Sequence, residues 1–395
     1  MLMRYEKHCG FVCGKQFMKQ MTLSAGGFER YGKTMRRAAF LAEMNRIVPW
    51  AKLCAVVEHV YPKAGNGRPP IGLGRMLRIY FLQQWFNLSD PAVEEALYDS
   101  LAMRDFVGID LGREPAPDET TVCKFRHLLE KHDLGRSLFQ EVHRHLETQG
   151  LKVSTGTIVD ASIINAPSST KNAEQQRDPD MHQTRKGKQW YFGMKAHIGV
   201  DSQTKLIHSV VATAANVADS TVLPDLLHGE ETRVWGDQAY RGQRDVIRDC
   251  APKAKDFTNR RYRHCGVVDE LEKARNRTKS KVRAKVEHVF GVIKRVFGFA
   301  KVRYRGLEKN AHRLFVTCAL ANLFMVRHRL LRAQRAQCAC CTAMGHERPV
   351  KPRKTAQNQV VFPPSPENDP LASHSRYLFR CSLSLFLHDH AGDAA

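Results

Sequence analysis

The spacing of apolar residues along the chain changes from a helical period to a strand period near residue 151. Between residues 36 and 150, apolar side chains recur every three or four positions, as in helices that bury one face. Pro49 and the Gly/Pro-rich segment 62–70 interrupt this pattern and separate helices. We therefore predict an all-α N-terminal domain over residues 31–150. Residues 1–30 have weak periodicity and are expected to form a flexible arm.

One helix of this region has a basic surface. Asp118 is a suitable N-cap, and the helix after it is expected to expose Thr121, Lys124, Arg126 and His127. A helix of this kind can enter the major groove of DNA. An ordinary amphipathic helix with a basic surface has the same pattern, so both interpretations stay open at this point.

After residue 151 the pattern is that of strands. Residues 152–164 are rich in β-branched side chains, and residues 193–200 and 205–212 read as two further strands across a turn at 201–204. The elements expected next are a helix at 220–227, a strand at 232–235, a helix at 242–250 and a long helix at 279–297. This order is that of an RNase H-like α/β fold, so we predict an RNase H-like catalytic domain over residues 151–332, with a mixed sheet flanked by helices.

Three further segments complete this picture. Residues 165–189 are polar and cationic and predict a loop beside the sheet. A strand at 301–305 and an apolar helix at 310–331 are expected to finish the packed domain. Residues 333–395 mix Pro, Lys, Arg and Ser without a period, and we predict a poorly ordered C-terminal tail.

The charge of the chain indicates its partner. Lys and Arg number 62 against 40 Asp and Glu, which gives a formal net charge of +22 and favours a polyanion such as nucleic acid. No uninterrupted apolar run of about 18 residues is present, so we expect no membrane partner. The first residues lack an apolar signal core, and the 11 cysteines are scattered, both of which favour the cytoplasm.

Three acidic residues stand out from their surroundings. Asp160 interrupts an apolar strand, Asp237 closes the strand Val-Trp-Gly, and Glu287 is the single carboxylate within the basic stretch 279–297. Each has an ordinary explanation, because Asp at a strand end is usually a turn or cap residue and Glu287 forms an i, i+4 pair with Arg283. Taken together, however, the three carboxylates are hard oxygen ligands, and ligands of this kind suit Mg²⁺ or Mn²⁺. Two such ions about 3.5–4 Å apart can cleave and transfer phosphodiesters.

The same residues carry a resemblance to a known family. Thr157-Ile-Val-Asp-Ala-Ser162, Trp235-Gly-Asp-Gln-Ala-Tyr240 and Arg283-Ala-Lys-Val-Glu-His-Val-Phe290 resemble the three acidic blocks of the DDE insertion-sequence transposases, in the group named after insertion sequence five. The resemblance covers about residues 21–331. In the third block of the wider family, Tyr, Arg, Glu and Lys stand at spacings of three, four and seven. Arg283, Glu287 and Lys294 match, whereas Ser280 replaces the tyrosine.

This resemblance implies a function and a set of site residues. Asp160, Asp237 and Glu287 would be catalytic and would bind two Mg²⁺ or Mn²⁺ ions. The implied activity is cleavage at the ends of an insertion sequence and strand transfer into target DNA, in a homo-oligomer on double-stranded DNA with terminal inverted repeats. The implied location is the bacterial cytoplasm, at the nucleoid when bound to DNA. The residues expected to contact DNA are Arg283, Lys294, Lys285, Arg295, Lys124 and Arg126.

Two other functions remain open on the sequence. An RNase H-like nuclease without strand transfer would share the three acids, and a catalytically decayed DNA-binding protein would use the basic surface alone. The intact acids argue against decay. Lys195 and His197, which alternate on the second expected strand, either face the same site or form a structural pair.

Overall fold

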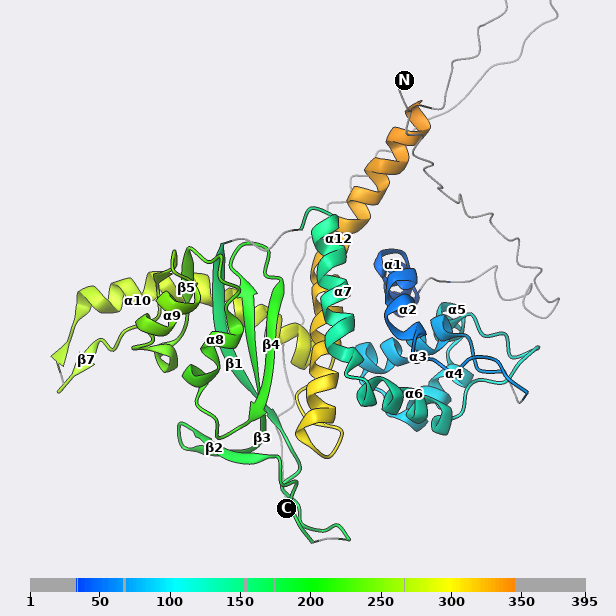
Figure 1. The fold of residues 1–395 in the computed structure, drawn as a ribbon, viewed down its shortest axis with the longest axis horizontal. Coiled ribbons are helices and arrows are strands. Elements are labelled where there is room, and N and C mark those ends of the chain that lie inside the picture. The colour runs from blue at the N-terminus through cyan, green and yellow to red at the C-terminus, as the bar shows by residue number, and fades with distance from the viewer. Residues whose placement is uncertain are drawn as a thin grey trace, which may run out of the picture. The chain divides into compact units, whose positions relative to one another are not determined.

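The computed structural model describes residues 33, 35–66, 69–151, 155–173, 175–265 and 267–344, apart from some side chains. The N-terminal segment 1–30, which was predicted to be flexible, lies outside these residues, as does the predicted tail beyond residue 344. The first part of the chain is helical, as predicted (Figure 1). Its helices are α1 (Arg36–Ile47), α2 (Trp50–Glu58), α3 (Leu73–Phe86), α4 (Asp90–Asp99), α5 (Leu101–Val107), α6 (Glu119–Lys131) and α7 (Leu134–Thr148).

Local side-chain bonds define the ends of several of these helices. Ser89 Oγ accepts a hydrogen bond from the Ala92 N–H and begins α4, and Asp118 Oδ1 accepts one from the Thr121 N–H and begins α6. Asn87 ends α3 with φ of 52°, a left-handed conformation that Asn tolerates better than most residues. The cap predicted at Asp118 is therefore confirmed.

The second part of the chain forms a mixed sheet. Strands β1 (Gly156–Asn165), β3 (Gln189–Asp201) and β4 (Ile207–Ala214) pair antiparallel, which is the predicted meander. Strand β5 (Arg233–Trp235) runs parallel to β1, and β6 (Lys255–Asp256) runs parallel to β5. A strand absent from the prediction, β2 (His182–Lys186), pairs with the start of β3 inside the segment expected to be a loop. Its exposed polar residues hide the strand from a pattern of apolar side chains.

Helices cover this sheet and supply its third acidic residue. The short helical turn Asp219–Val222, α8 (Leu223–Leu226) and α9 (Arg244–Cys250) follow β4 and β5. The small hairpin of β7 (Arg263–His264) and β8 (Val267–Val268) leads into α10 (Glu270–Arg283). The helix predicted as continuous over 279–297 is divided, because α11 (Lys285–Gly291) follows α10 and a π-helical turn occupies Val292–Val296.

The predicted strand at 301–305 is wrong. Only Lys301 makes an isolated parallel bridge, to Asn165. The other polar groups of the segment bind elsewhere: the Arg303 guanidinium donates to the carbonyls of Asn87 and Leu88, and Asn310 Nδ2 donates to the Tyr304 carbonyl at 2.7 Å. Because these bonds serve a turn into the next helix, no sheet ladder forms.

The last helix, α12 (Leu307–Met344), joins the helical region to the sheet. It continues beyond the predicted end at residue 331 and into the predicted tail. By length and composition, Leu307–Arg335 could cross a membrane, but 72% of its most apolar window is buried within the protein. Tyr80 of α3 contacts His312, and Asn322 bonds both the N–H and the carbonyl of Ile207 on β4 at 2.8 Å. One hydrophobic core therefore extends from residue 41 to residue 331.

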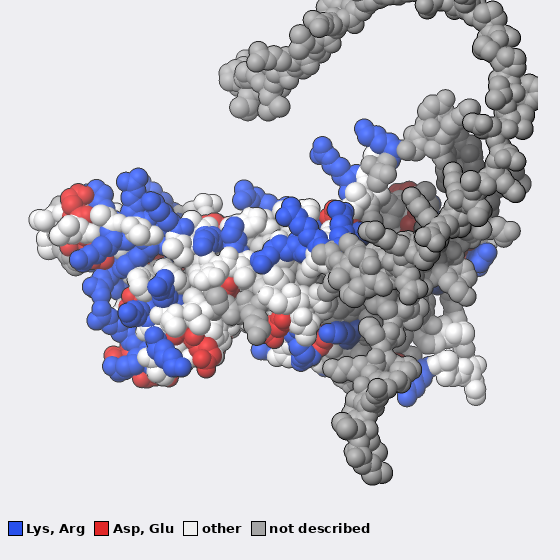
Figure 2. Space-filling model, turned by 90° about the horizontal axis from the view of Figure 1, so that it is seen from above, with Lys and Arg blue, Asp and Glu red and all other residues white. Residues whose placement is uncertain are grey.

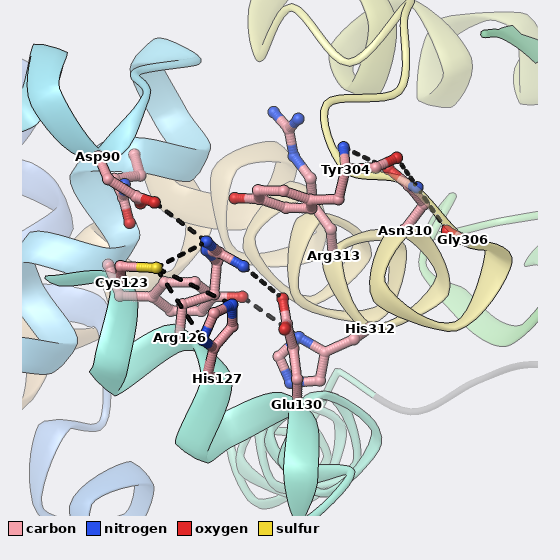
Figure 3. A network of polar contacts seen from close by, with 12 residues as sticks. Asp90, Cys123, Arg126, His127, Glu130, Tyr304, Gly306, Asn310, His312 and Arg313 are labelled. Atoms are coloured by element: carbon pink, nitrogen blue, oxygen red, sulfur yellow. Dashed lines mark hydrogen bonds and ion pairs between the residues drawn. The ribbon is translucent and has the colours of Figure 1, made fainter. Parts of the chain in front are cut away.

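Arg126 of α6 is buried, which corrects the expectation that it faces solvent and DNA. Its side chain is 6% exposed and lies between Asp90 and Glu130, at 3.0 Å from each carboxylate (Figure 3). The guanidinium also stacks 4.2 Å from the centre of the Tyr304 ring. A guanidinium can be buried when carboxylates and an aromatic face replace its water. Arg126 is thus a structural residue, whereas Lys124 on the same helix is exposed.

We expect Arg126→Ala to lower the free energy of unfolding by about 3–5 kcal/mol, because it leaves two buried carboxylates without their cation. Urea unfolding measures the change. The control is Arg113→Ala, which removes an exposed ion pair with Asp110 and should cost less than about 1 kcal/mol. Equal effects of the two substitutions would show that the Arg126 contacts do not stabilise the fold.

We also expect a specific acid sensitivity from His312. Burial lowers the pKa of this side chain to about 4, against about 6.5 in an unfolded chain. Between these values the unfolded chain binds the proton and the folded chain does not. The contribution of neutral His312 to the free energy of unfolding is therefore fully present above about pH 6.5. It is lost as the pH falls towards 4, by up to about 3 kcal/mol.

The comparison is between the wild type and His312→Gln in urea unfolding at pH 7 and pH 4.5. The urea midpoint of the wild type should fall more steeply than that of the variant. Parallel curves would mean that His312 does not carry this dependence.

Candidate active site

The pairing of two parallel strands places the first two acids side by side. Ile158 of β1 lies opposite Trp235, the last residue of β5, and an aspartate stands two residues after each of them, Asp160 and Asp237. Asp160 lies on the central strand and is 8% exposed. Asp237 follows the end of β5, where its Oδ1 accepts a hydrogen bond from the Ala239 N–H at 2.8 Å.

The third acid comes from α11, which contacts β1. Val286, Val289 and Phe290 of this helix are buried in the core, and they orient Glu287 on the opposite, exposed side. At the end of the preceding helix, the Arg283 guanidinium lies 3.3 Å from Asp160 Oδ2. Residues far apart in sequence therefore meet beside β1, where β5 ends.

All three acids line one polar cavity of about 400 Å³. Arg283 lines it as well, and β2 contributes Arg185 and Lys186. The remaining lining residues are Ala161, Ser162, Ile163, Thr184, Lys195, Asp219 and Phe290. The cavity thus combines acidic residues with a surrounding set of cations.

The electrostatics of the cavity show an excess of negative charge around β1. Burial raises the pKa of Asp160 to about 6; the Arg283 guanidinium and the Ala161 N–H oppose this, and the nearby Asp237 and Glu287 add to it. Burial raises the pKa of Tyr240, and the carboxylates of Asp219, Asp160 and Asp237 raise it further; the Tyr240 hydroxyl makes no hydrogen bond to the described residues. A cation near these carboxylates would stabilise them in the charged form.

The three acids offer oxygen donors that suit a divalent ion. All three predicted ligands are carboxylates that face one polar cavity, which is the donor chemistry that Mg²⁺ and Mn²⁺ prefer. With the side chains as they stand, the described residues include no group of three His, Cys, Asp or Glu that could hold a metal ion. The Arg283 guanidinium supplies the positive charge beside Asp160 instead.

Three of the predicted DNA-contacting cations surround this region without lining the cavity. Lys294 Nζ donates to the Ile163 carbonyl of β1 at 2.5 Å, and burial lowers the pKa of Lys294. Lys285 Nζ donates to the Ser202 carbonyl at 2.6 Å, whereas Arg295 is exposed. Both lysines are therefore held by backbone carbonyls near the site.

Ser280, which stands in place of the family's tyrosine, makes a local structural contact. Its Oγ accepts a hydrogen bond at 3.2 Å from Asn259 Nδ2. This bond ties α10 to the segment after β6. The serine thus holds the approach to the site in position.

Asp219 is a residue of the cavity that the sequence did not indicate. It begins the helical turn after β4, where an aspartate is expected as an ordinary N-terminal residue of a helix. Its Oδ1 lies 2.9 Å from Lys195 Nζ, and Lys195 also donates to the Val217 carbonyl at 2.7 Å. Lys195 therefore faces the cavity, which is the first of the two interpretations offered for it from the sequence.

His197, the other residue of that pair, is structural. It is fully buried, and its Nε2 lies 2.8 Å from Thr213 Oγ1. Burial lowers its pKa to about 4, although Asp219 opposes the change, so the ring is neutral at pH 7.

Comparison with known proteins finds similarity to transposase domains. Residues 152–323, which contain Asp160, Asp237 and Glu287, match the family model of the transposase DDE domain. Residues 29–128 match a second family, described as a transposase domain (DUF772). Among solved structures, the chain is similar to piggyBac transposase in a synaptic complex with hairpin DNA, at 8% identity over 74% of each chain and a TM-score of 0.42.

The two family matches fall on separate parts of the chain, one on the helical region and one on the sheet with its acids. Both are matches to transposase domains: the region of the sheet is similar to a transposase DDE domain, and the helical region is similar to a second transposase domain.

Proposed function

We propose that this protein cleaves DNA at the ends of an insertion sequence and transfers the freed strand into target DNA. The observation that carries the proposal is the meeting of Asp160, Asp237 and Glu287 at one polar cavity. The resemblance of the surrounding motifs to the insertion-sequence-five group supports it, with Ser280 as the departure. We place the bound protein at the bacterial nucleoid, as a homo-oligomer.

The sheet supports an RNase H-like assignment for the catalytic domain. Strands β4, β3 and β1 lie in that order as an antiparallel set, and β5 and β6 extend β1 as a parallel set. The acids then lie on the central strand, after the adjacent parallel strand and on a later helix. This is the order in which the sequence presented them.

The three carboxylates are the residues that would hold the divalent ions, two of Mg²⁺ or Mn²⁺. When bound, such ions activate the attacking oxygen and stabilise the leaving oxygen of an in-line displacement. The protein's own cations have a different task. Arg283, Arg185 and Lys186 line the same cavity and can neutralise the phosphate oxygens of a strand placed there.

The positions of Lys195 and Lys294 suggest that they help to shape the cavity. Lys195 is fixed between the Asp219 carboxylate and the Val217 carbonyl, so its ammonium group keeps one position. Lys294 is fixed on the Ile163 carbonyl, next to the strand that bears Asp160. Fixed cations near the acids favour a polyanionic substrate, in agreement with the net charge of +22.

The decisive substitutions are Asp160→Asn and Glu287→Gln. Each removes one ligand charge and little volume, so we expect strand cleavage to fall below detection while DNA binding stays nearly unchanged. The substrate is a duplex carrying the sequence that flanks the coding region, incubated with Mg²⁺ or with EDTA. Glu308→Gln, a change at an exposed glutamate of α12, is the matched control and should cleave normally.

The outcomes separate the competing functions. Metal-dependent nicking that both variants lack, followed by joining to a second duplex, supports the proposal. Nicking without joining would identify a nuclease. Binding without cleavage under any divalent ion would identify a DNA-binding protein that has lost catalysis.

A further inference from the structure

A strongly basic projection leads to the cavity. We call it the arm, and it consists of residues 259–263 and helix α10 (Glu270–Arg283). It contains nine Lys or Arg residues and two Asp or Glu residues. In the space-filling view, blue side chains crowd the end of the molecule where α10 lies (Figure 2). The arm therefore carries a large excess of positive charge.

The arm is held together by its own polar contacts. The buried Asn276 binds the backbone of Arg260 twice, through a hydrogen bond from the N–H at 3.1 Å and one to the carbonyl at 2.6 Å. Lys279 Nζ donates to the Thr258 carbonyl at 3.0 Å, and the buried Glu272 lies 3.7 Å from the same ammonium group. These bonds attach the segment to the inner side of the helix. The arm is therefore a built element with a defined outer side.

The outer side presents a row of cations. Lys273, Arg277 and Lys281 are exposed at a spacing of four residues, which places them along one side of the helix. Lys273 forms an exposed pair with Glu270, whereas Arg277 and Lys281 make no ion pair within the described part of the chain. A row of like charges repels itself, so a polyanion that lies along it is stabilised.

The row ends at the catalytic cavity. Arg283 closes α10 and contacts Asp160, and the Ser280–Asn259 bond fixes the same end of the arm. Ten residues separate Lys273 from Arg283, which corresponds to about 15 Å of helix at 1.5 Å per residue. Successive base pairs rise about 3.4 Å along a duplex. The row therefore matches about four or five base pairs measured from the cavity.

We propose that the arm binds the phosphate backbone of the duplex on one side of the cleaved bond, over about four or five base pairs. This inference rests on the proposed function, because it takes the cavity as the place of cleavage. The contact is made to phosphates and is independent of base sequence. The competing interpretation is a contact with a second copy of the chain, because Tyr262 and Leu271 of the arm and Val267 of the adjoining hairpin are exposed apolar side chains.

The test uses the full chain with three substitutions on the row, Lys273→Gln, Arg277→Gln and Lys281→Gln. Glutamine keeps helix propensity and removes only charge. The matched control neutralises three exposed cations of α12, Lys309→Gln, Arg329→Gln and Arg332→Gln. Fluorescence anisotropy with labelled duplexes measures affinity in EDTA. The duplexes carry the flanking sequence and extend from the expected cut by 2 or by 10 base pairs, on one side at a time (lengths of roughly this size bracket the span above).

On the long duplex of one side, the arm variant should lose on the order of tenfold in affinity, and its salt slope should decrease by about 2 to 3. On the short duplexes it should bind like the wild type, and the control should resemble the wild type throughout. Equal losses on long and short duplexes, or equal losses in the control, would overturn the proposal. A change in oligomeric state by light scattering, with unchanged DNA affinity, would assign the arm to a second copy instead.

The failure of this inference is distinguishable from failure of the proposed function. Affinity is measured without a divalent ion and does not depend on cleavage. If the arm variant loses no more affinity on the long duplex than on the short one while the wild type still cleaves, only this inference fails. If the wild type does not cleave but the variant loses affinity on the long duplex alone, only the proposed function fails.

Discussion

The parallel pairing of β1 with β5 is the contact on which the site depends. It sets Ile158 opposite Trp235, so that Asp160 on β1 and Asp237 just after β5 line the same cavity. A slip of one residue would turn one of the two side chains to the other face. The buried residues Ile158 and Val159 on β1, which pack in different hydrophobic clusters, make such a slip costly, because it would exchange the side chains that fill the two faces. The hydrophobic core thereby fixes the geometry of a polar site.

The charges of the site form a balance between burial and attraction. Burial raises the pKa of Asp160, and the other two acids raise it further, whereas Arg283 lowers it. The chain therefore keeps a cation in contact with the most buried acid. The cations of β2 and of the arm add further positive charge around the acids of the cavity.

Helix α12 connects the two regions through one core and a set of buried polar bonds. Asn322 satisfies an N–H and a carbonyl on β4, and His312 and Arg313 reach side chains of α3. Arg126 contributes a buried ion pair on the side of α6, against Tyr304. Buried polar groups of this kind stabilise the fold only when all their partners are present. The relation between the helical region and the sheet is thus specified by particular side chains as well as by apolar packing.

The sequence by itself determined the features that depend on near neighbours: the helical region, the three successive strands, the cap at Asp118, and the three acids as candidates. A cap bond spans three residues, and alternation is local, so both can be recognised in a short window. Only the tertiary structure decided that Arg126 is buried, that β2 pairs within a polar segment, that residues 301–305 form no strand, and that Asp219 joins the cavity. Each of these depends on partners outside that window, such as Asp90 for Arg126, 36 residues away. Burial and pairing are properties of the folded chain, and no local pattern records them.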